Sequence, residues 1–194
     1  MNLRDHSTLF VFLMLATDKK FFIIEDMTVN LERAYISEHS PDDVWKAINT
    51  PLVPELGEVA SDIQPWLRFS YERLDDEGLI QAGTCIIGVP TQALVELVPG
   101  PFRSKIPQDM ELVVSDHSPE TRTRTDSLES EKRSGTVRYE VKEGADGSGL
   151  LVVEGEISLA GMESMFEAQF AEHGVYLPAG RTLDHAPELI AGHP

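Results

Sequence analysis

The chain has 194 residues, of which 41% are hydrophobic and 25% charged, and its formal net charge at pH 7 is -17. This length favours one domain that can bury a core without disulfides or metals, and the composition excludes a chain that is disordered throughout. The negative charge disfavours nucleic acid as a partner, because phosphate would be repelled.

The charge is uneven along the chain. Residues 103–138 carry seven basic and seven acidic side chains, whereas the segments before and after them carry net charges of -9 and -8. Such a neutral stretch is usually local balance on solvated strands, and we favour that interpretation. The alternative is a positive spot that receives an anionic group of a ligand.

Cysteine content and the N-terminus give expectations about the compartment. Cys85 is the only cysteine, so no disulfide can form within the chain, and a reducing cytoplasm is the simplest location. The apolar run from Leu9 to Ala16 is shorter than the ~20 residues of a membrane span. It also lacks the positive flank of a signal peptide, because Arg4 is followed by Asp5. We expect residues 1–26 to be an extension outside the folded domain.

In chain order, the first predicted elements are a strand and a short helix. Hydrophobic and polar residues roughly alternate over 29–35, which indicates a strand. Ser40 is a suitable N-cap, Pro41 suits the first helical position, and two aspartates follow in the first turn. Pro51 ends this helix, because the residue before a proline avoids helical backbone angles.

A series of strands follows. Because the connections between them are short, we expect antiparallel pairing. The stretch 121–128 is polar on both faces, which is typical of an edge strand, although its arginines or threonines could instead face a cavity. The alternating segments are 67–71, 79–89, 92–98, 110–114, 121–128, 137–141 and 150–159.

Beyond Gly161 the hydrophobic period changes to that of a helix. Met162, Met165, Phe166 and Phe170 recur on one face, so an amphipathic helix is predicted. We expect it to end at His173 and Gly174. The remaining residues 176–194 are predicted to be irregular, apart from a short helix over 183–190 that Pro187 limits.

The segment from Leu31 to Trp45, with Ser40-Pro41-Asp42-Asp43-Val44-Trp45 at its helix start, resembles the opening of START-like domains. This superfamily includes the Bet v 1, polyketide cyclase/dehydrase (SRPBCC-type) and Aha1-type families. Gly135–Tyr139, Val153–Gly155 and the helix from Met162 follow in the same order, so the resemblance covers residues 27–175. It implies an α+β helix-grip fold: a curved antiparallel sheet wrapped around a C-terminal helix, with a cavity between them.

The resemblance also implies a ligand site but carries no fixed catalytic residue. Methionine and aromatic side chains suit an adaptable apolar pocket, and tyrosine or arginine could supply its polar groups. We expect no cofactor and no metal, and His39, His117 and His173 are interpreted as solvated or capping residues. The predicted lining residues are Phe69, Tyr71, Arg124, Tyr139, Val153, Met162, Phe166 and Phe170.

The functional hypothesis is binding of a small hydrophobic molecule of lipid, polyketide or aromatic type, without nucleic acid or a membrane span. One alternative is a cyclase or dehydratase, for which Tyr71, Tyr139 and Arg124 are the candidate groups. The other is a protein-interaction module of the Aha1 type. That module predicts a filled interior and an exposed apolar patch.

Overall fold

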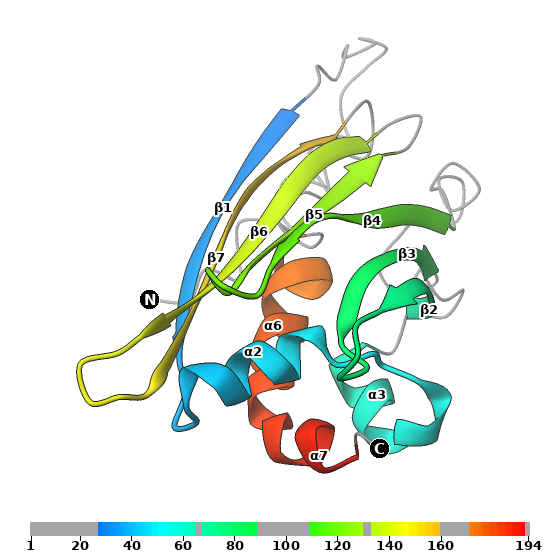
Figure 1. Ribbon diagram of the computed structural model, residues 1–194. Helices are drawn as coiled ribbons and strands as arrows, with labels where there is room; N and C mark the ends of the chain where they lie inside the picture. The colour runs from blue at the N-terminus through cyan, green and yellow to red at the C-terminus, as the bar shows by residue number, and fades with distance from the viewer. Residues whose placement is uncertain (1–26, 65–66, 89–108, 130–132, 160–170, 193–194) are drawn as a thin grey trace, which may run out of the picture.

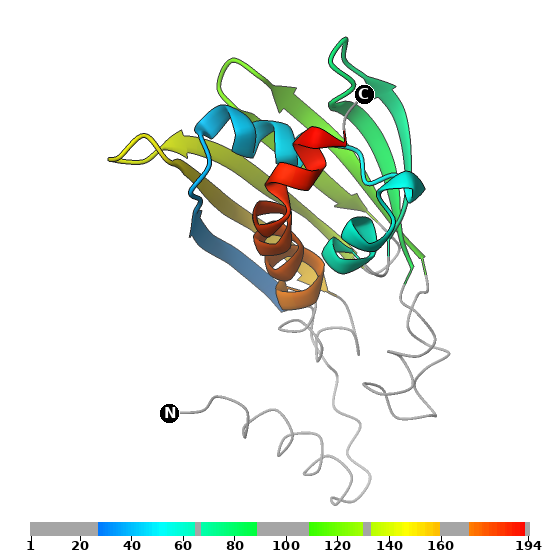
Figure 2. The same ribbon diagram turned by 90° about the horizontal axis from the view of Figure 1, so that it is seen from below.

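The computed structural model describes residues 27–64, 67–88, 109–129, 133–159 and 171–192. A curved seven-stranded antiparallel sheet forms one layer, and helices lie against one face of it (Figures 1 and 2). The predicted α+β helix-grip architecture is therefore confirmed.

Six strands follow one another as a meander from β2 to β7, and β1 adds to its far edge beside β7. The first and last strands of the chain are thus neighbours, paired from Met27 opposite Leu159 to Ile36 opposite Leu150. The strands are β1 (Met27–Ile36), β2 (Leu67–Leu74), β3 (Ile80–Gly88), β4 (Asp109–Ser118), β5 (Thr123–Glu129), β6 (Arg133–Glu143) and β7 (Gly149–Leu159).

The helix start at Ser40 is confirmed. Helix α2 (Pro41–Asn49) has Ser40 as its N-cap, and the Ser40 hydroxyl accepts a hydrogen bond from the backbone N–H of Asp43 at 3.2 Å. Val44, Trp45 and Ala47 are buried. Helix α2 therefore packs its apolar stripe onto β6, β7 and α6 (Leu177–Asp184), which belongs to the closing helix.

Three short helical segments that the sequence pattern did not reveal, or revealed only in part, form a second small core. They are a 3-10 turn (Pro54–Leu56), α3 (Glu58–Ile63) and α7 (Ala186–Ala191). Ile63, Ala186 and Leu189 are buried together with Ala47 of α2. This second core joins α2, α3 and the end of the chain on the same side of the sheet (Figure 2).

The closing helix does not end at Gly174, so that prediction is wrong. A π-helical turn (Glu172–Tyr176) runs directly into α6 (Leu177–Asp184), and α7 follows after His185. Pro178 lacks the N–H that a regular helix would direct at residue 174, and a widened π turn accommodates the missing bond. The expectation of irregular structure is likewise wrong for 177–182, whereas the short helix predicted over 183–190 is found in part as α7.

One stripe of the closing helix faces the sheet. Ala171, Val175, Ala179 and Leu183 recur every four residues and are all buried in the main core. The strand side of this core is formed mainly by Leu31, Val137, Val141, Leu151, Val153 and Ile157.

Hydrogen bonds tie the closing helix to the edge strand β1. The hydroxyl of Tyr35 donates to the backbone carbonyl of Tyr176 at 2.7 Å, and the hydroxyl of Tyr176 accepts from the backbone N–H of Glu32 at 2.9 Å. Arg33 forms two hydrogen bonds to the Glu172 carboxylate, at 3.0 and 3.4 Å. Its guanidinium lies 3.8 Å from the ring centre of Tyr176.

Two glycines permit close contact between β6 and β7. A Cβ on Gly155 would lie 2.2 Å from the carbonyl oxygen of Thr136, and one on Gly135 would lie 2.2 Å from that of Glu156. Only glycine fits such positions, and glycines within strands often mark sharp bends of a sheet.

The edge-strand interpretation of 121–128 is wrong, because β5 lies between β4 and β6. The predicted strand over 92–98, the extension 1–26 and most of the Met/Phe helix lie outside the described residues. Among the helices described, none is long and apolar enough to cross a membrane.

Candidate ligand-binding site

Strand register places one residue from each of five strands in a single row. His117 of β4 is opposite Arg124 of β5, which is opposite Tyr139 of β6; Val153 of β7 and Arg33 of β1 continue the series. We call these five residues the cross-sheet row. His117 and Arg124 contact α2, and Val153 and Arg33 contact the closing helix, so the row lies on the covered face.

At β7 the row is closed and apolar. Val153 has no exposed surface and packs in the core that contains Val175 and Ala179 of the closing helix. Tyr139, the next residue in the row, packs against this core but remains only partly buried.

On β5, the row contains one partner of a buried ion pair. Arg124 donates from Nε and Nη2 to the two carboxylate oxygens of Asp126, at 2.9 Å each, and Asp126 is 2% exposed. Nη1 of Arg124 also donates to the carbonyl oxygen of Ile48 at 2.6 Å, near the C-terminal end of α2, and the guanidinium lies 5.0 Å from the Tyr139 ring centre. The polarity of β5 is therefore explained by a charge pair that holds α2 to the sheet.

His117 completes the polar end of the row, so its interpretation as a solvated or capping residue is wrong. Its ring centroid lies 5.0 Å from that of Trp45, at an interplanar angle of 36°. An irregularity between Val114 and Asp116 shifts the alternation of β4, so the period-two pattern did not place His117 on the inner face. Burial, and secondarily the charge of Arg124, lowers the pKa of His117 below its ordinary value.

The structure brings some of the predicted lining residues together. Arg124, Tyr139 and Val153 occupy consecutive positions of the cross-sheet row. Phe69 and Tyr71 lie on β2, at the opposite edge of the sheet from β1. The structure describes their backbone but not their side chains. Met162, Phe166 and Phe170 lie outside the described residues. Their role in the site stays a prediction.

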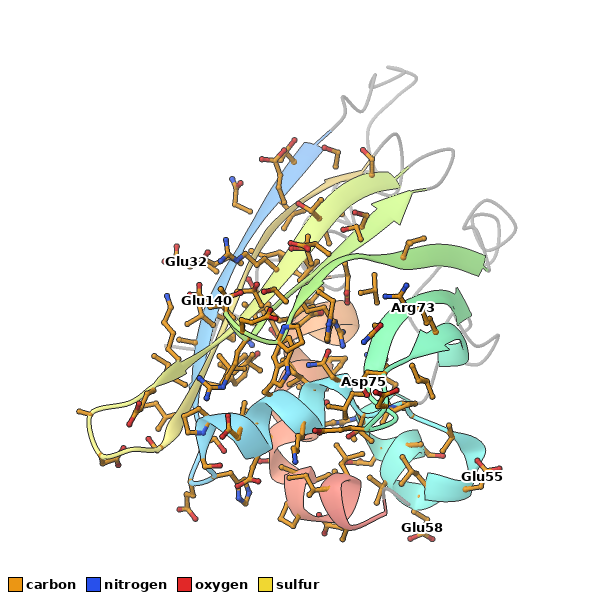
Figure 3. The ribbon with its side chains drawn as sticks, viewed as in Figure 1. Glu32, Glu55, Glu58, Arg73, Asp75 and Glu140 are labelled. Carbon is orange, nitrogen blue, oxygen red and sulfur yellow. The ribbon has the colours of Figure 1, made fainter. Side chains whose placement is uncertain are left out.

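A hollow of about 470 Å³ lies at the turn between β2 and β3, and it is open to solvent. Figure 3 shows two of its lining residues, Arg73 and Asp75, on this hairpin, and Glu32 on the other side of the molecule. Its lining is largely charged, which does not suit an apolar ligand. In the part of the chain that the structure describes, no group of histidine, cysteine, aspartate and glutamate could hold a metal ion.

Comparisons with known proteins place the fold. No family model and no curated protein matches the sequence. Among solved structures, norcoclaurine synthase from Thalictrum flavum is similar with a TM-score of 0.54 and 14% identity, covering 89% of this chain and 95% of that one. Ara h 8.0201 has a TM-score of 0.53 and 11% identity, covering 84% of this chain and 99% of that one. The Zhui aromatase/cyclase from Streptomyces sp. R1128 has a TM-score of 0.53 and 14% identity, covering 87% of this chain and 100% of that one.

Proposed function

We propose that this chain, which has the helix-grip fold of the Bet v 1-like and START superfamily, binds a small hydrophobic molecule between its sheet and its closing helix. The ligand would be of lipid, polyketide or aromatic type. The observation that carries the proposal is the cross-sheet row, in which the fully buried Val153 adjoins the partly buried Tyr139, Arg124 and His117 on the inner face.

The polar residues of the row support a recognition role. A buried ion pair such as that of Arg124 and Asp126 stabilises a fold no better than well-packed hydrophobic residues would. Its value here is geometric, because it fixes a charged plane beside the ring of Tyr139. A pocket that binds small molecules typically combines apolar walls with a few fixed polar groups of this kind.

The driving force would be burial of apolar ligand surface. Each Å² removed from water contributes roughly 25 cal/mol, less the costs of association. A displacement assay with a fluorescent apolar probe, run against a panel of lipids, aromatic compounds and polyketide-type compounds, tests this. Native mass spectrometry of the purified protein would show any ligand that it retains.

A matched pair of variants locates the binding site. Tyr139→Ala removes an aromatic wall of the row, whereas Thr136→Ala changes an exposed residue of the same strand. We expect Tyr139→Ala to weaken probe binding and Thr136→Ala to leave it unchanged. Absence of any bound species, together with no displacement by any member of the panel, would refute the proposal.

A lyase acting on a polyketide-like substrate is the second candidate, because a similar solved structure is titled an aromatase/cyclase. Arg124 and Tyr139 lie together as that hypothesis requires. Product analysis by mass spectrometry after incubation with a linear poly-β-ketone distinguishes the two roles. Cyclised or dehydrated product supports the lyase, and recovery of unchanged substrate supports binding alone.

The protein-interaction module is less well supported. The large hydrophobic residues that are exposed in the described part of the chain are Ile36, Val53, Leu74 and Val113, and Ile36 and Leu74 lie on the two opposite edge strands, β1 and β2. A docking surface would instead gather such residues in one patch.

A further inference from the structure

His117 is held in an unusual environment at the polar end of the cross-sheet row. Its ring is only partly buried, yet its Nε2 atom is buried and has no hydrogen-bond partner among the described residues. A buried polar atom without a partner costs roughly 1–3 kcal/mol, so such atoms in native proteins call for an explanation. A hydrogen-bonding group on a ligand in the interior would supply the missing partner.

The charges around His117 determine which ligand group can be its hydrogen-bond partner. The Arg124 guanidinium, which neighbours His117 in the row, is already paired with the Asp126 carboxylate through two hydrogen bonds. Asp75, Asp116 and Asp126 also act on His117, and all three favour its protonated form, but burial outweighs them and lowers the pKa of His117, which favours the neutral imidazole. A ligand carboxylate placed here would therefore meet no uncompensated positive charge, and burying it would be costly.

We propose that Nε2 of His117 forms a hydrogen bond with an uncharged hydroxyl group, a phenol or an alcohol, on a hydrophobic ligand. A hydroxyl group both donates and accepts, so it satisfies either tautomer of a neutral imidazole. The indole of Trp45, whose ring centroid lies 5.0 Å from that of His117, would flank the same group. This inference rests on the proposed function and specifies the chemical class of its ligand.

Three probes that share one ring system test the assignment. They are naphthalene, which has no polar group, 2-naphthol, which has an uncharged hydroxyl, and 2-naphthoate, which is ionised at pH 7. The dissociation constants are measured for the full chain at pH 7. We expect 2-naphthol to bind more tightly than 2-naphthoate, and equal or tighter binding of 2-naphthoate would overturn the proposal.

Substitution of the histidine identifies the residue. In His117→Phe, the ratio of the dissociation constants of 2-naphthol and naphthalene should rise by about three- to tenfold, as expected for the loss of one hydrogen bond. His117→Gln keeps a polar amide and should restore part of the preference. His39→Phe, which removes a histidine outside the row, should leave the ratio unchanged. An unchanged ratio in His117→Phe overturns the proposal.

A measurement on the unaltered protein covers the case in which the variants do not fold. With histidine labelled by nitrogen-15, the Nε2 resonance of His117 should shift on addition of 2-naphthol and remain in place with naphthalene. Equal responses to both probes overturn the role of His117 but leave apolar binding intact. Failure of all three probes to bind would overturn both this inference and the proposed function.

Discussion

Arg124 and Asp126 lie two residues apart on β5, and their side chains form a two-pronged ion pair inside the protein, with 13% and 2% of each side chain exposed. The pair also reaches α2, because Arg124 donates to the carbonyl of Ile48 and, at 3.4 Å, to Oδ1 of Asn49. One arginine thus couples the middle strand of the sheet to the helix that supports the closing helix.

The substitution Asp126→Asn should be strongly destabilising. It leaves the buried guanidinium of Arg124 without its counter-charge, at a cost of about 3–5 kcal/mol in the free energy of unfolding. Urea denaturation measures the loss. Glu77→Gln is the control, because it breaks an exposed ion pair with Lys46 and should cost less than about 1 kcal/mol.

The double substitution Arg124→Met/Asp126→Leu separates charge from packing. If the cost of Asp126→Asn arises from an unpaired buried charge, replacing both charges by apolar residues should restore most of the stability. Equal losses in the single and the double variant would show that packing, and not the charge pair, holds α2 to the sheet.

Gly155 and Gly174 should respond in opposite ways to alanine. Gly155→Ala places a methyl group 2.2 Å from the carbonyl oxygen of Thr136, so β6 and β7 must separate, at a cost of about 1–3 kcal/mol. A Cβ on Gly174 meets no atom within 4 Å, and Gly174→Ala should stabilise the helical turn by about 0.5–1 kcal/mol. A marked loss in Gly174→Ala would contradict the continuous closing helix. Thermal unfolding of both variants provides the measurement.

Tyr176 should protect one backbone amide of the edge strand. In Tyr176→Phe the N–H of Glu32 loses its hydroxyl acceptor at 2.9 Å, and its hydrogen exchange should accelerate by about fivefold. The amide of Val141, which donates to the carbonyl of Arg122 at 2.9 Å, serves as the internal reference. Equal acceleration at both amides would indicate global destabilisation rather than loss of this contact.

His117 should make stability depend on pH in a defined range. Burial lowers the pKa of His117 from its ordinary value of 6.5 in the unfolded chain, so the unfolded chain binds the proton first as the pH falls. This contribution to the free energy of unfolding is complete above pH 6.5 and is lost as the pH decreases from there towards the lower pKa of the folded state. In His117→Phe the free energy of unfolding should change less steeply with pH in this range. An unchanged pH dependence would contradict the prediction.

Local sequence signals predicted most of the fold. Ser40 and Pro41 specify the start of α2 through capping and backbone geometry, which depend on neighbouring residues only. The strands were predictable for the same reason, because alternation is local. Gly174 shows where this reasoning stopped: a glycine near Pro178 usually ends a helix, but packing of Val175 and Ala179 against the sheet carries the helix through.

The candidate site was only partly predictable. Tyr139 and Val153 followed from alternation on β6 and β7, yet their adjacency depends on strand register, which the sequence pattern alone does not specify. The ion pair on β5 was mistaken for the polarity of an edge strand, because the position of a strand within a sheet is a tertiary property. His117 was hidden by the irregularity in β4.

The central claim is that an apolar ligand enters the space against the inner face of the sheet. NMR spectra of the protein with carbon-13-labelled valine methyl groups, titrated with 2-naphthol, test it most directly. The account predicts saturable shifts at Val137 and Val153 on the covered face and none at the exposed Val113. Saturable shifts at Val113 alone, or no shift at any valine, would contradict it.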